Sequence, residues 1–114
     1  PNTEPGSITT GTDMTIDTAD QMLPAVSRIF SLLGDPSRLK ILFHCFESPK
    51  AVSEIASAIS LSPSLVSHHL RLMRRARLIR GDRQSKQVYY RVSNPRVAEL
   101  LHSTLLHVRE EHLH

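Results

Sequence analysis

A concentration of positive charge between Leu61 and Val92 is the part of this sequence with the clearest chemistry. Eight of the fourteen Lys and Arg residues lie between Arg71 and Arg91, where Asp82 is the single acid. Lys and Arg neutralise the phosphates of nucleic acids, and the major groove of a duplex admits one helix. A basic helix followed by a basic hairpin therefore predicts a module that binds double-stranded DNA.

Apolar residues recur at steps of three and four in five stretches, which predicts five helices. The stretches run from about Ala19 to Gly34, from Pro36 to Ser48, from Ala51 to Ile59, from Pro63 to shortly before Leu78, and from Pro95 to about Glu111. Three of these helices start with a capping residue followed by proline, namely Asp35, Ser62 and Asn94. Because proline is tolerated only near a helix start, the regular part of the first helix is expected to begin close to Pro24.

Between the fourth and fifth helices the apolar period changes to about two, which predicts a β-hairpin. Its strands are expected at Leu78–Arg80 and Gln87–Val92, around a polar turn from Gly81 to Lys86. The buried side of the fourth helix is expected to consist of Leu65, Val66, Leu70, Leu72 and Met73. Four helices, a hairpin and a helix (α-α-α-α-β-β-α) form a mainly α fold, the winged helix-turn-helix. The third and fourth helices, joined by three residues, would be the helix-turn-helix pair.

Composition sets the limits of this assignment. Residues 1–18 are rich in Thr, Gly, Pro and acids and predict a disordered arm, which leaves residues 19–114 as one DNA-binding and dimerisation domain. Met14 is a candidate native start, so whether residues 1–13 are native stays open. With a single cysteine, Cys45, and no apolar run of about 20 residues, the chain is expected to be cytoplasmic and to have no membrane partner.

Three segments of the chain resemble the ArsR/SmtB family of bacterial repressors. They are Leu33–Leu42 (LGDPSRLKIL), Ser64–Arg74 (SLVSHHLRLMR) and Arg83–Val92 (RQSKQVYYRV), in the family's order and spacing. The resemblance implies a homodimer whose first and last helices pack across the two-fold axis. It also implies repression by binding to operator DNA, relieved by an inducer that is a metal ion in many members.

The residues expected to contact DNA fall into two groups. The early part of a recognition helix faces base edges, and basic residues further along it or on the wing reach the backbone. The candidates are Ser62, Ser64, Ser67, His68, Arg71, Arg74 and Arg75 on the helix, and Arg83, Gln84 and Lys86 on the wing. Ser62 can instead be only an N-cap, and His68 only a surface or packing histidine.

The resemblance implies two kinds of inducer site, and the sequence departs from both. A thiolate site needs a Cys-x-Cys pair at the start of the third helix, where Lys50–Glu54 contains no cysteine. The other site lies between the last helices of two protomers. Its first ligand pair corresponds here to Asn94 and Arg96 and its second to His107 and Glu110. Arg96 is a permanent cation and cannot bind a metal, so the four-ligand site is incomplete.

A rearranged metal site at the end of the chain is one interpretation of the ligand pair that remains, His107 and Glu110. His107, Glu110 and His114 fall on one polar face of the last helix and suit zinc, nickel or cobalt. The competing interpretation is an ion pair between Arg96 and Glu110 of antiparallel helices, with the histidines solvated. A third possibility is a thiol sensor at Cys45, although a lone cysteine between aromatic residues is more typically a small buried hydrophobe.

Other classes of function fit the sequence less well. The sequence has no catalytic constellation or Gly-rich phosphate loop that stands apart from the family pattern, so an enzyme is not expected. A winged helix that binds proteins instead of DNA would not need the basic helix and hairpin. Among DNA-binding interpretations, a repressor that responds to a non-metal ligand, to thiol oxidation or to no ligand is the alternative to a metal sensor.

Overall fold

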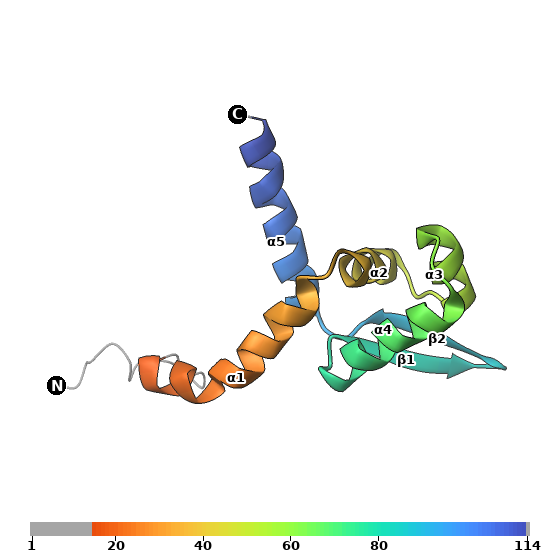
Figure 1. Cartoon of the computed structure of the whole chain (residues 1–114), viewed down its shortest axis with the longest axis horizontal. Coiled ribbons are helices and arrows are strands. Elements are labelled where there is room, and N and C mark those ends of the chain that lie inside the picture. The colour runs from red at the N-terminus through yellow and green to blue at the C-terminus, as the bar shows by residue number, and fades with distance from the viewer. Residues whose placement is uncertain (1–14, 114) are drawn as a thin grey trace. The chain divides into compact units, whose positions relative to one another are not determined.

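The computed structural model describes residues 15–113 of the chain, in the predicted order of elements (Figure 1). The elements are α1 (Ile16–Leu33), α2 (Pro36–Glu47), α3 (Val52–Ile59), α4 (Pro63–Arg75), β1 (Ile79–Gln84), β2 (Gln87–Val92) and α5 (Pro95–His112). Within the described residues the chain divides into two compact units, which meet between Ser31 and Leu32. The predicted mainly helical fold with one hairpin is confirmed. Residues 1–14 of the predicted arm lie outside the described residues.

Helix α1 differs from the prediction at its start. It begins at Ile16, ahead of Ala19, and Pro24 lies inside it. The Thr15 hydroxyl accepts a hydrogen bond from the Thr18 N–H at 3.2 Å, so the helix is capped well before the proline. Proline removes one helical hydrogen bond, but here it does not mark where the regular helix starts. The expectation for Pro24 was wrong.

The three predicted cap-and-proline starts are confirmed. The Asp35 carboxylate accepts from the Arg38 N–H at 3.0 Å at the start of α2. The Ser62 hydroxyl accepts from the Leu65 N–H at 3.1 Å at the start of α4. The Asn94 side chain accepts from two backbone N–H groups at the start of α5. Each cap satisfies donors that the first turn of a helix leaves free, and proline at the next position has no N–H to satisfy.

Helices α3 and α4 are the predicted helix-turn-helix pair, and they pack against each other. Ser60 ends α3 in a left-handed conformation with φ of 58°. The Leu61 N–H then donates to the Ala56 carbonyl at 3.2 Å, which closes the end of the helix. The connection is therefore fixed by its own backbone before α4 begins.

One face of α4 is buried and differs in part from the prediction. The buried residues are Val66, His69, Leu70 and Met73, at helical steps of three, one and three. Leu65 was expected among them but is 41% exposed. At about 100° per residue, Leu65 points away from the line through Val66 and Leu70, and His69 takes the inner position instead.

The hairpin has longer strands and a shorter turn than predicted. β1 continues to Gln84, so only Ser85 and Lys86 form the turn. Ser85 has φ of 57°, a conformation that two-residue hairpin turns require. The expected polar turn from Gly81 was therefore wrong, because Gly81 pairs with Tyr90 inside the ladder. A Cβ on Gly81 would lie 2.9 Å from the Tyr90 ring, so glycine leaves room for that ring.

The core of the second unit joins the helix-turn-helix pair to α2 and to the base of the hairpin. Apolar residues of this core that are at most 6% exposed include those of α2 (Ile41, Leu42, Cys45), α3 (Ile55, Ala56) and α4 (Val66, Leu70, Met73), together with Leu78 just before β1 and Ile79 at its start. The packing of α2 on α3, α3 on α4, α4 on β1 and α2 on β2 encloses this core. The recognition helix and the hairpin are thus held by the same set of buried side chains.

The connection between α2 and α3 also pairs with the hairpin. Lys50 and Tyr90 form an antiparallel bridge, in which the Lys50 N–H donates to the Tyr90 carbonyl at 3.0 Å and the Tyr90 N–H donates to the Lys50 carbonyl at 2.8 Å. The Lys50 ammonium donates to the His44 carbonyl at 2.9 Å, at the end of α2. Main-chain and side-chain bonds of one residue therefore join α2 to β2.

Candidate nucleic-acid interface

The exposed face of α4 carries most of the predicted contact residues. Ser64, His68, Arg71 and Arg75 follow one another at steps of four, three and four, and all four are exposed. Ser67 is half-buried and Arg74 is exposed, beside the same line. The burial of the opposite face against α3 and β1 fixes the rotation of the helix about its axis. The predicted serines, histidine and arginines are therefore presented together on one surface.

Ser62 has a structural role at the start of this helix. Its hydroxyl caps α4 through the Leu65 N–H, which is the role that the sequence left open beside base contact. The residue is exposed, and a hydroxyl that accepts from the backbone still has a proton to donate. The cap therefore accounts for Ser62 without any contact to DNA.

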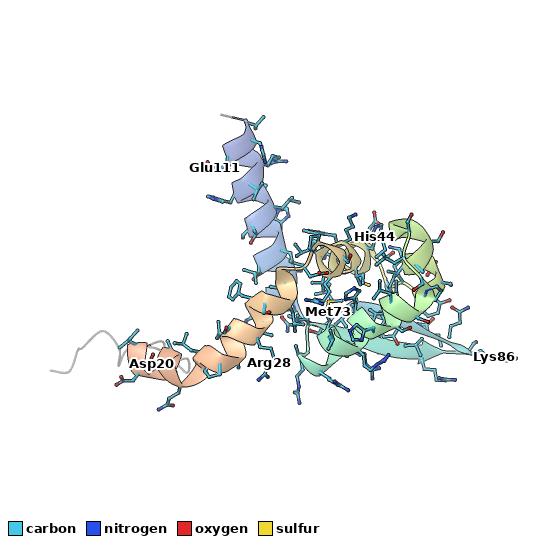
Figure 2. All side chains as sticks on the ribbon, in the orientation of Figure 1. Asp20, Arg28, His44, Met73, Lys86 and Glu111 are labelled. Atoms are coloured by element: carbon cyan, nitrogen blue, oxygen red, sulfur yellow. The ribbon has the colours of Figure 1, made fainter. Side chains whose placement is uncertain are left out.

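The far end of the hairpin carries the predicted wing residues. Arg83, Gln84 and Lys86 are exposed, and Figure 2 shows Lys86 at the tip, away from the helices. Within residues 15–113, neither Arg83 nor Lys86 pairs with an acid. Their charge is therefore available to an anionic partner.

Two further arginines lie at the base of the hairpin, and sequence reasoning assigned them no role. Arg80 and Arg91 face each other across the ladder. Asp82 forms an ion pair with each, with its Oδ1 at 3.0 Å from Arg80 and its Oδ2 at 3.2 Å from Arg91. The spacing of Arg80 and Asp82 on one strand was visible in the sequence, but the position of Arg91 depends on the register of the second strand.

His69 is a second feature that sequence reasoning missed. It is buried on the inner side of α4, with its Nδ1 3.4 Å from a guanidinium nitrogen of Arg38 on α2. Burial lowers the pKa of His69 and Arg38 adds to this, while Asp35 opposes it. The ring is therefore neutral at pH 7, and the stability that it contributes is present above the ordinary value of 6.5 and lost as the pH falls below it.

Arg38 links this histidine to the turn before α2. Its Nε donates to the Leu32 carbonyl at 2.9 Å, and its backbone N–H donates to the Asp35 carboxylate. That hydrogen bond is the main cause that lowers the pKa of Asp35. The carboxylate is thus ionised at neutral pH, and Arg38 connects the turn at Asp35 to the inner face of the recognition helix.

The predicted metal ligands lie on α5, apart from the basic surface. His107 and Glu110 are both exposed and one helical turn apart, whereas His114 lies outside the described residues. Over residues 15–113, no three His, Cys, Asp or Glu side chains come together as a metal site. The Asn94 Oδ1 is engaged by the backbone N–H groups of Arg96 and Val97. With that oxygen used as a cap and a cation at Arg96, the family's four-ligand site does not fit this chain.

Cys45 is buried in the core at 2% exposure, and burial raises its pKa to about 12. A thiol is reactive as its thiolate, so an apolar environment of this kind opposes the chemistry of a sensor. The interpretation as a small buried hydrophobe agrees with this environment.

The pKa of Cys45 leads to a rate prediction. A shift from 9.0 to about 12 leaves about a thousandfold less thiolate at pH 8. The native protein should therefore react with iodoacetamide about a thousandfold more slowly than the same protein unfolded in urea, as measured by mass spectrometry over time. Equal rates in the two states would show that the thiol is accessible and ionisable. Since the folded pKa is raised, the stability associated with the buried thiol is kept below pH 9 and lost as the pH rises toward 12.

Among residues 15–113, no helix combines the length and apolar content needed to cross a bilayer. The chain also matches a known protein family. The family described as "Bacterial regulatory protein, arsR family" matches residues 35–80, which cover α2, the helix-turn-helix pair and the start of the hairpin.

Relatives and solved structures extend this similarity over most of the chain. The chain is 35% identical over 97 residues to the transcriptional repressor SmtB homolog of Synechocystis sp., covering 85% of this chain and 70% of that protein. It is 33% identical over 95 residues to the cadmium resistance transcriptional regulatory protein CadC homolog of Staphylococcus aureus, covering 82% and 78%. A solved homodimeric winged helix-turn-helix DNA-binding domain, Mb0332 of Mycobacterium bovis, has a TM-score of 0.75 at 27% identity, covering 90% and 94%. The chain therefore belongs to the arsR family of bacterial regulatory proteins.

Proposed function

We propose that this protein is a homodimeric repressor that binds double-stranded operator DNA in the cytoplasm and leaves it when an inducer binds. The observation that carries the proposal is the joint presentation of an exposed basic helix face and an exposed basic hairpin by one core. It acts by binding and not by catalysis, in keeping with relatives that are transcriptional regulators.

The proposed dimer rests on apolar side chains of the first and last helices. On α1, Met22, Leu23 and Phe30 are more than half exposed, and on α5 Leu105 and Val108 are 52% and 43% exposed. Exposed apolar surface of this extent is typical of an interface with another protein. Mb0332, which has the same fold, is described as homodimeric. A second copy of this chain is therefore the proposed partner of these helices.

Roles on DNA follow from the position of each side chain. We assign base contacts to Ser64, Ser67, His68 and Arg71, since the early part of a recognition helix faces the base edges. Arg can bond to two acceptors of guanine, and Ser bonds to a base or a phosphate. We assign backbone contacts to the remaining candidates, which are Arg74, Arg75, Arg83, Gln84 and Lys86. Ser62 acts mainly through its cap.

An electrophoretic shift tests the function directly. The duplex upstream of the gene for this chain should bind more tightly than a shuffled duplex of the same length and composition. Arg71→Ala should reduce that preference more than it reduces binding to the shuffled duplex, since Arg71 is assigned to bases. A protein that shifts neither duplex at low salt would instead be an interaction module, and the proposed function would be wrong.

For the inducer we propose a metal ion at the end of α5 as the first candidate. His107 and Glu110 lie one turn apart on the exposed side of the helix and offer the nitrogen and oxygen ligands that suit zinc, nickel or cobalt. The CadC homolog is described as a cadmium resistance regulator. His114 is the proposed third ligand. An ion pair between Arg96 and Glu110 of the partner helix is the competing role of these residues.

Metal titration of the protein–DNA complex separates these roles. Zinc, nickel, cobalt or cadmium should release the operator duplex, and His107→Ala should abolish the release while leaving metal-free binding unchanged. His102→Ala, an exposed histidine on the same helix, is the matched control. Release by none of these ions would leave a non-metal ligand as the inducer and remove the proposed metal site.

A further inference from the structure

Asp82 is the only acid in the basic segment from Leu61 to Val92, and each of its carboxylate oxygens forms an ion pair with an arginine. Arg80 is bound to one oxygen at 3.0 Å and Arg91 to the other at 3.2 Å. All three side chains are 38–52% exposed, so the cluster lies at the surface and not in the core.

Strand register explains why one carboxylate reaches both arginines. Arg80 lies directly opposite Arg91, and Asp82 is two residues further along β1 on the same face of the ladder. Two cations placed directly opposite repel each other, and an acid diagonal to one of them offsets that repulsion. The cluster therefore has net charge +1 where two free arginines would present +2.

The cluster divides the positive charge of the hairpin into two sets. Arg83 and Lys86 near the tip have no acidic partner within the described part of the chain, whereas Arg80 and Arg91 at the base are both occupied. Exposed ion pairs are weak, so the arginines are ordered without being fixed permanently. Removal of the acid would leave both guanidinium groups exposed beside a surface that already attracts phosphate.

We propose that Asp82 limits the sequence-independent affinity of the hairpin for DNA by holding Arg80 and Arg91 away from phosphates. This inference rests on the proposed DNA-binding function. Sequence-independent binding grows with the number of phosphates that a protein neutralises. By occupying two of the cations, Asp82 keeps the repressor from binding tightly to arbitrary DNA, which competes with the operator in a genome.

The test compares Asp82→Asn with the wild-type protein on a shuffled duplex over a series of salt concentrations. Asn keeps the shape of the side chain and removes the charge. We expect several-fold to tenfold tighter binding near 0.1 M salt, with a salt slope steeper by about 0.9 for each arginine recruited to a phosphate. Asp20→Asn makes the same charge change on α1, where Asp20 forms no ion pair with any residue from 15 to 113, and should change neither quantity.

Two further variants make the result specific to the arginines. Arg80→Gln and Arg91→Gln combined with Asp82→Asn should lose the gain and return close to wild-type affinity and slope. Asp82→Ser repeats the charge change with a side chain of another shape, in case the Asn variant does not fold. Circular dichroism and thermal unfolding establish that each variant is folded before it is compared.

The outcomes separate this inference from the proposed function. If wild-type protein binds neither operator nor shuffled duplex, the proposed function fails. If wild type binds and the folded Asp82 variants show unchanged or weaker binding with an unchanged slope, the proposed function stands and the role of Asp82 is wrong. Weaker DNA binding by the Asp82 variants would mean that the ion pairs position the arginines for DNA instead of holding them away from it.

Discussion

Replacement of both Arg83 and Lys86 with alanine is expected to weaken binding to operator and shuffled DNA by a similar factor, about ten- to a hundredfold near 0.1 M salt. These are the exposed cations near the hairpin tip for which the described chain provides no acid. Each lost phosphate contact should reduce the salt slope by about 0.9, so a dimer that loses four contacts should lose up to about 3.6. Fluorescence anisotropy with labelled duplexes at five or more salt concentrations measures both quantities.

The matched control removes the same charge from elsewhere on the second unit. Lys40 on α2 and Arg109 on α5 are exposed, and their replacement with alanine should leave the slope nearly unchanged. If both double variants behave alike, the effect comes from net charge and not from the hairpin. Unchanged affinity of the Arg83 and Lys86 variant at low salt would show that the hairpin does not reach DNA.

Leu70→Ala is expected to have the largest effect on stability among changes to the recognition helix. Leu70 is 2% exposed and lies between Val66 and Met73 on the buried face of α4. Truncation of a buried leucine removes apolar contacts and leaves a cavity, which costs about 2–5 kcal/mol. Urea unfolding at a fixed protomer concentration, followed by circular dichroism, measures the free energy of unfolding, because a dimer's stability depends on concentration.

Leu65→Ala on the same helix is the control for this change. Leu65 is 41% exposed, so its truncation should cost about 1 kcal/mol and clearly less than that of Leu70. The pair removes the same atoms from the two sides of one helix. Equal losses of stability would mean that Leu65 is buried in the assembled protein and that the face of α4 assigned to DNA is different.

Local signals account for what the sequence could predict. Asp35, Ser62 and Asn94 each precede a proline and cap the next helix, so the interaction that starts each of these helices lies within three residues of the cap. The order of the elements and the exposed basic face of the fourth helix were predictable because they too depend on residues that are close together in the sequence. The periodicity of the apolar residues and the caps point to the same boundaries.

The features that the sequence could not predict depend on contacts between residues far apart in the chain. The contact of His69 with Arg38, 31 positions earlier, brings two helices together and cannot be found from the sequence near either residue. The turn at Ser85 was missed because serine rarely adopts the positive φ found there. The pairing of Asp82 with Arg91 depends on the strand register, which a six-residue turn would have shifted.

The bridge between Lys50 and Tyr90 determines which substitutions the hairpin attachment tolerates. Both bonds of the bridge use main-chain atoms, so the side chain at position 50 can change in size or charge without detaching β2 from the connection before α3. Proline is the exception, because it has no N–H to donate to the Tyr90 carbonyl. A change of side chain at position 50 would therefore remove the bonds of the Lys50 ammonium to the end of α2 and keep the bridge to β2, whereas proline would remove part of the bridge itself.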